Sequence, residues 1–187
     1  SDVTITAWDV DLAGSLSAGT KTLSIHGAET GQSIGLGATT ANMHILAVEL
    51  QRVTATSGLR VGSELGGSIV VNTITAANSG GVIPTVTLVA AHTDKQVAFE
   101  GGAAVFDTLV VQADAGIIVE QAVSTTGGSL YLDGDKDSAA DGASNTLGFT
   151  DGLTQTAETV MTLSALAAGG IVPAGKLTLA AKTGVYI

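Results

Sequence analysis

One loop of the sequence carries acidic side chains at a spacing that could bind a metal ion: Asp133, Asp135, Asp137 and Asp141. Oxygen ligands at alternating positions of a flexible loop are what Ca²⁺ requires. The spacing begins like an EF-hand loop, but Ser138 stands where the turn glycine belongs, Ser144 replaces the bidentate glutamate, and Lys136 opposes a cation. We therefore expect a solvated acidic turn, with a weak calcium site formed by these four aspartates as the alternative.

A second pair of carboxylates could act on sugars. Asp9 and Asp11 lie two positions apart on an expected strand, so that both would face the same side. Paired carboxylates serve as general acid and base in glycoside cleavage. Trp8 stands beside them but would point the other way. We expect an outward polar face here, and a glycan-binding or polysaccharide-processing site that uses Asp9, Asp11 and Trp8 is the alternative.

The remaining reactive residues form no recognisable catalytic motif. His26, His44 and His92 are not spaced as metal ligands, and the chain contains no cysteine. The glycine pairs precede expected strands and lack the pattern of a phosphate-binding or dinucleotide-binding loop. The sequence therefore predicts a protein that is not an enzyme, with no catalytic or cofactor-binding residues.

Composition excludes several partners. The formal net charge is −10 with only 7 basic residues, so the chain lacks the clustered cations that nucleic acids and anionic membranes attract. No apolar run reaches the roughly 18 residues that a membrane span needs. The hydrophobic fraction is 45% but only 3% of the residues are aromatic, which favours a narrow core of stacked aliphatic side chains.

The elements that must position these residues are short strands that recur along the whole chain. Each alternates apolar and small polar residues, and most are followed by a turn rich in small residues; the copies start near residues 3, 21, 67, 85, 128, 160 and 176. Such a unit cannot bury its apolar side alone and must stack on its neighbours. The pattern predicts an all-β, single-stranded, right-handed parallel β-helix (β-solenoid) of about eight or nine coils, spanning residues 1–187 as a single domain.

One segment departs from strand periodicity. Between residues 42 and 53 the apolar residues Met43, Leu46, Leu50 and Val53 recur every three or four positions, as on one face of a helix. Asn42 could cap that helix. We expect one short helical segment near 42–53 that packs over the solenoid and caps an open end of it.

Several blocks of the sequence resemble filamentous-haemagglutinin-type surface proteins. The resemblance rests on 3–19, where Val3-Thr4-Ile5-Thr6-Ala7 precedes Asp9-Val10-Asp11-Leu12-Ala13-Gly14, on 46–63 with Leu46-Ala47-Val48-Glu49-Leu50, and on the tail Gly175-Lys176-Leu177-Thr178-Leu179. It implies a right-handed parallel β-helix from a large secreted or surface-displayed protein, as in an adhesin shaft. The family supplies no general catalytic residues.

The resemblance leads to expectations about location and partners. We expect an extracellular or cell-surface protein whose function is structural or adhesive. Both the first and the last residues read as strand, so we expect a segment or subunit of a longer assembly that associates with itself end to end or laterally. A cell-surface glycan or protein receptor is a further expected partner.

Overall fold

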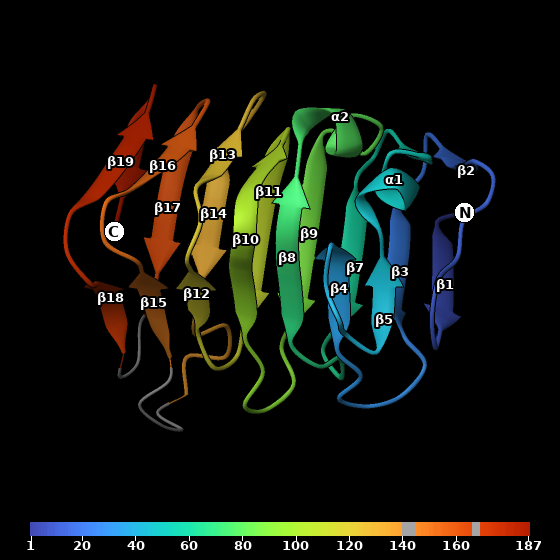
Figure 1. The fold of residues 1–187 in the computed structure, drawn as a ribbon, viewed down its shortest axis with the longest axis horizontal. Helices are drawn as coiled ribbons and strands as arrows, with labels where there is room; N and C mark the ends of the chain where they lie inside the picture. Colours follow the sequence, from blue (N-terminus) through green and yellow to red (C-terminus); the bar gives the residue numbers. More distant parts are fainter. Residues whose placement is uncertain (140–144, 166–168) are drawn as a thin grey trace.

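The computed structural model describes residues 1–139, 145–165 and 169–187, and nearly all of its regular secondary structure is parallel β-strand (Figure 1). The first sheet contains eight strands, which agrees with the expected eight or nine repeats. In spatial order they are β1 (Val3–Ala7), β3 (Leu23–Gly27), β7 (Leu59–Ser63), β9 (Thr85–Ala90), β11 (Thr108–Ala113), β14 (Leu130–Asp133), β17 (Val160–Ser164) and β20 (Gly184–Tyr186).

A second sheet runs alongside the first. Its main path is β18 (Gly170–Pro173), β15 (Thr146–Phe149), β12 (Ile117–Val119), β10 (Val97–Phe106), β13 (Val123–Thr125), β16 (Leu153–Ala157) and β19 (Leu177–Ala181). Three further strands extend it from β10: β8 (Ile69–Ile74), then β4 (Ile34–Gly37), then β5 (Met43–Ile45). A separate parallel pair joins β2 (Leu16–Gly19) to β6 (Val53–Ala55).

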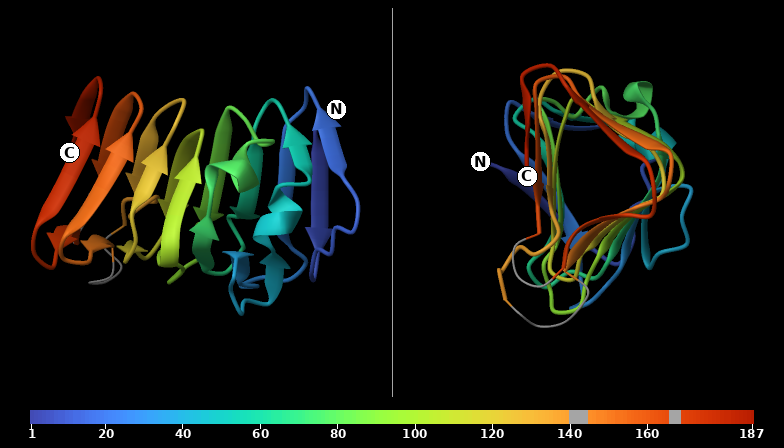
Figure 2. Two further views of the ribbon diagram at one scale, coloured as in Figure 1. Left: turned by 45° about the horizontal axis from the view of Figure 1, so that its top comes forward. Right: turned by 90° about the vertical axis from the view of Figure 1, so that its left-hand side faces the viewer.

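The long strand β10 divides the second sheet into two sides. Val97–Phe99 pair with β12, whereas Ala104–Phe106 pair with β13, and the register shifts between Glu100 and Ala104. Gly101, with a φ of 70°, lies at this interruption, where a left-handed backbone favours glycine. In the view along the long axis, successive repeats of the two sheets overlie one another (Figure 2). The arrangement fits a parallel β-helix.

Side chains of one kind stack on one another through successive strands because the strands are parallel and in register. In the first sheet, Ile5, Ile25, Val61, Leu88 and Val111 follow one line, and Leu132 and Leu163 continue it. From Ile25 to Leu163 these side chains are buried. The expected aliphatic core is confirmed.

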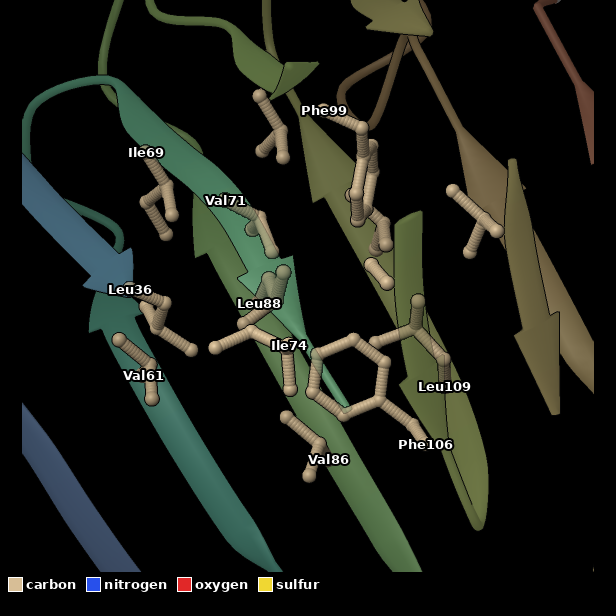
Figure 3. Packing of buried hydrophobic residues seen from close by; sticks show 14 of the residues in the cluster. Leu36, Val61, Ile69, Val71, Ile74, Val86, Leu88, Phe99, Phe106 and Leu109 are labelled. Carbon is tan, nitrogen blue, oxygen red and sulfur yellow. The ribbon is translucent and has the colours of Figure 1, made fainter. Parts of the chain in front are cut away.

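The two sheets pack their inner faces against each other. Figure 3 shows Val86, Leu88 and Leu109 of the first sheet facing Ile74 and Phe106 of the second. Phe99 and Phe106 are the largest of the fully buried side chains. Burial of an aliphatic or aromatic side chain of this size contributes about 1.5–3 kcal/mol, so the stacks provide most of the driving force for folding.

The expected short helical segment near 42–53 is confirmed, but it is a single turn and does not include the first residues of that range. Residues Met43–Ile45 form β5, which pairs with β4 at the outer edge of the second sheet, and only α1 (Ala47–Leu50) is helical. The N-cap position is Leu46 rather than Asn42. Hydrogen bonding to an open sheet edge outweighs the helical periodicity for Met43–Ile45. The expected capping of an open end by this segment stays a prediction.

A second short helix, α2 (Ala76–Ser79), was not predicted. Thr75 caps it, since its hydroxyl accepts a hydrogen bond from the Asn78 amide at 3.3 Å, and the Asn78 side chain accepts one from the Thr75 amide at 3.0 Å. The helices α1 and α2 contact each other at one corner of the fold (Figure 1). Both helices lie in connections between strands, so neither interrupts the ladders.

Candidate functional site

A hollow on the surface lies on the outer face of β1, β3 and β7. We call it the β1–β7 hollow; its volume is about 530 Å³, and it is lined by Thr4, Thr6, Ser24, His26, Arg60, Gly62 and residues 27–30 and 63–65. The strands form its floor, and the corners that follow β3 and β7 form its wall. The register aligns Thr4 with Ser24 and Arg60, which places these side chains in one row across three strands.

One hydrogen-bonded pair fixes the centre of the floor. The Nδ1 atom of His26 lies 3.0 Å from the Gly27 carbonyl, which can only accept, so Nδ1 carries the proton. In the neutral ring, Nε2 then accepts from the Thr6 hydroxyl at 3.1 Å. Gly62 follows Val61, the partner of Ile25, and adds no side chain beside His26. The hollow is open at this point for that reason.

Charged residues tie the wall to a distant part of the chain. Glu64 accepts from Arg60 at 3.1 Å through one carboxylate oxygen and pairs with the Lys136 ammonium through the other. The hydrogen bond from Lys136 is the main reason that the pKa of Glu64 lies below its usual range, and the charges of Lys136 and Arg60 act in the same direction. Lys136 follows β14, so this ion pair links the corner of β7 to a loop three strands further along the sheet.

Several polar groups of the hollow remain available to a ligand. Within the described residues, the Thr4 and Ser24 hydroxyls and the Glu29 carboxylate have no hydrogen-bond partner. Arg60 uses only Nη2 in its bond to Glu64, so the guanidinium keeps further donors. The site therefore offers donors and acceptors side by side.

The predicted carboxylate pair does not form a site on a strand. The first strand ends at Ala7, so Trp8, Asp9 and Asp11 lie in the connection that follows it, and the expectation that they occupy a strand is wrong. The Asp9 carboxylate accepts from the His44 amide at 2.7 Å and thereby anchors β5. Asp11 is exposed, and Trp8 keeps 55% of its surface accessible. The hydrogen bond to the His44 amide gives the Asp9 carboxylate a structural role, and no catalytic role is needed to explain its position.

The acidic loop is folded more tightly than a solvated turn. Asp133 and Asp135 are both buried, contrary to that expectation, whereas Asp137 is exposed. The Asp133 carboxylate accepts from the Tyr131 hydroxyl at 3.1 Å, and the Asp135 carboxylate accepts from the Asn145 amide group at 3.1 Å. Asp137 accepts from the Ala139 amide at 2.9 Å. The carboxylates therefore make structural hydrogen bonds, to side chains and to a backbone amide.

The calcium alternative remains a prediction. Asp141, one of the four predicted ligands, lies outside the described residues. Among the residues that are described, no group of three or more histidine or acidic side chains is arranged to hold a metal ion.

Sequence reasoning missed the β1–β7 hollow. Alternation alone places Thr4 and Thr6, Ser24 and His26, and Arg60 on outward faces of their strands. What it cannot supply is the register that aligns these strands, because Leu23 pairs with Leu59 across a long insertion, 36 positions along the chain. The sequence carried one signal of this site: His26 and Arg60 stand among threonine and serine residues on these outward faces.

Comparisons of the chain with protein-family models, with curated proteins and with solved structures found no match. Across the described part of the chain, none of the helices has the length and apolar character that crossing a lipid bilayer would require.

Proposed function

We propose that this chain is a rigid structural or adhesive element of an extracellular surface, either a shaft segment or a self-assembling fibre subunit built as a closed, right-handed β-helix. The observation that carries the proposal is the unbroken in-register ladder of the first sheet, which runs through all eight of its strands. A stack of this kind transmits load through backbone hydrogen bonds and a continuous core. The stability of such a stack also depends little on which side chains face outward, which suits a spacer.

Two features support the closed, right-handed form. Ribbons of successive repeats overlie one another when viewed along the long axis, around one shared core (Figure 2). Connections between parallel strands are right-handed in about 98% of cases. The resemblance to filamentous-haemagglutinin-type proteins points to the same architecture and to the cell surface, with a glycan or protein receptor as partner.

Charge supports contact between the two ends of such units. Residues 1–20 contain Asp2, Asp9 and Asp11 and no basic residue, whereas residues 169–187 contain Lys176 and Lys182 and no acidic residue. The outer strands β1 and β20 each have one neighbour among the described strands. A further parallel strand, from adjoining sequence or from another copy, would continue the ladder and bring opposite charges together.

Sedimentation velocity over a concentration series, combined with electron microscopy with and without Ca²⁺, tests this proposal. Particles that lengthen with concentration at constant width are expected of a fibre subunit, and a stiff monomer at every concentration is expected of a shaft segment. A frictional ratio typical of a flexible chain, or growth without a constant width, would contradict both forms. A higher melting temperature in Ca²⁺ is expected only if the acidic loop binds the ion.

A further inference from the structure

We propose that the β1–β7 hollow binds a short, neutral oligosaccharide. This inference rests on the adhesive form of the proposed function, for which it names a glycan site. It does not depend on the ladder that joins the strands, because it concerns outward side chains of three of them. The hollow of about 530 Å³ falls within the roughly 300–1,000 Å³ of small-molecule sites.

The polar groups of the hollow match a ligand that both donates and accepts. Each sugar hydroxyl is a donor and an acceptor at once. The Thr4 and Ser24 hydroxyls can play either role, the Arg60 guanidinium donates, and the Glu29 carboxylate accepts. Because the Thr6 proton is directed to His26, the Thr6 oxygen is left to accept from a ligand. No single charge dominates this set.

Other ligand classes fit less well. Arg60 is the one lysine or arginine among the lining residues, and Glu64, which opposes its charge, also pairs with Lys136. Glu29 adds a further negative charge. A phosphate or an acidic polysaccharide would be repelled, because the chain has a net charge of −10. An apolar ligand would strip water from the Thr4 and Ser24 hydroxyls without replacing its hydrogen bonds.

An exposed aromatic residue is tied through its backbone to the corner loop of the hollow. Trp8 directly follows β1, and its carbonyl accepts from the Gln32 side chain, while the Ala7 carbonyl accepts from the Ala28 amide at 2.9 Å. These bonds tie the backbone at Trp8 to the corner loop that forms the wall. A half-exposed indole combines apolar area with a polar N–H group, which suits contact with a sugar ring.

Two measurements on the unmodified chain test the proposal. Maltoheptaose, cellopentaose and chitopentaose are titrated separately to about 10 mM, so that a millimolar Kd is detected. Trp8 is the sole tryptophan of the chain, so its fluorescence reports binding next to the hollow. We expect one of these sugars to change that fluorescence and to shift the amide NMR signals of residues 4–8, 24–30 and 60–65. Absence of binding by all three, or shifts confined to other residues, would overturn the proposal.

A matched pair of variants locates the site. Ser24→Phe fills the floor of the hollow, whereas Thr87→Phe places the same ring two strands along the same outward row, outside the lining residues. We expect Ser24→Phe to weaken binding at least tenfold and Thr87→Phe to leave it unchanged. Equal affinities for the two variants would overturn the assignment. If Ser24→Phe fails to fold, the shift map of the unmodified chain still decides the question.

Discussion

The two halves of the molecule are built on the same ladder but differ in what their corners carry. From β11 to β14 the repeat is short, since Leu109 pairs with Leu130, 21 positions along the chain. From β3 to β7 the corresponding step covers 36 positions and includes β5 and α1. The β1–β7 hollow and the predicted carboxylates Asp9 and Asp11 also lie in this N-terminal half, which we call the irregular half because it holds the 36-position step. In the other half, the step from β14 to β17 covers 31 positions and carries the acidic loop. The contrast indicates that the ladder sets the shape, while insertions at its corners supply the specific surfaces.

The largest effect is expected from a charge placed in the core. Ile69 lies in the second sheet between Ile34 and Val97, in the irregular half, and Leu163 lies near the other end of the first sheet. We expect Ile69→Asp to cost more than about 4 kcal/mol and to unfold the chain, because no partner compensates the buried carboxylate. Leu163→Asp is expected to disrupt mainly the strands from β14 onward, since each repeat contacts only its neighbours.

Circular dichroism and hydrogen exchange measure these two losses. Val70→Asp is the control, because Val70 neighbours Ile69 in β8 but is only half-buried. Native exchange protection throughout both core variants would contradict the stacked-core account.

A smaller loss is expected from a methyl group at a crowded corner. Gly62 has a φ of 86°, and a Cβ atom there would lie 2.1 Å from the Val89 carbonyl oxygen of the next strand. Gly152 has a similar φ of 80° but no atom within 4 Å of that position. Gly152→Ala is therefore expected to lower the free energy of unfolding only by the cost of a left-handed backbone at alanine, about 1–2 kcal/mol. Gly62→Ala is expected to lower it distinctly more. Urea denaturation compares them, and equal losses would show that the β7–β9 contact is looser than described.

The irregular half also depends on one buried carboxylate. Glu49 accepts from the amides of Leu12 and Leu46, each at 2.8 Å, and so fastens α1 to the first connection. We expect Glu49→Ala to cost about 1–3 kcal/mol because two amides lose their acceptor, and Glu49→Gln to cost less. Exposed Glu120→Ala is the control. Thermal unfolding measures the loss, and faster amide exchange at Leu12 would identify its origin; unchanged exchange would contradict this role.

The smallest effect concerns the ion pair between Glu64 and Lys136. Because the pKa of Glu64 is lowered in the folded protein, the pair stabilises the fold above the ordinary glutamate pKa of about 4.3 and loses this contribution as pH falls through the folded value. Lys136→Met is expected to cost at most about 1 kcal/mol at pH 7, since the pair is solvent-accessible. The difference from wild type should vanish at low pH and diminish in high salt. A difference that persists at pH 2 would assign the loss to packing.

The sequence was sufficient to predict strands but not how their outer faces combine. Period-two alternation identified the inward Leu, Val and Ile residues, because core burial imposes that pattern directly. It could not predict β5, where an open sheet edge prevails over the spacing of Met43, Leu46 and Leu50. Nor could it show that Asp133 and Asp135 are buried, because their hydrogen bonds are local features of the folded loop. The hollow depends on register across unequal repeats, which no local pattern encodes.

Distances between spin labels along one outward row test the central claim most directly. Thr4, Ser24, Arg60, Thr87, Val110, Tyr131, Thr162 and Tyr186 are aligned in register. The chain has no native cysteine, so spin labels attach only to introduced cysteines. Each double variant carries one cysteine in place of Thr4 and a second in place of Tyr131, Thr162 or Tyr186. At about 4.8 Å per strand, we expect narrow distributions near 24, 29 and 34 Å. Broad distributions, or distances that do not rise in even steps, would contradict a continuous rigid stack.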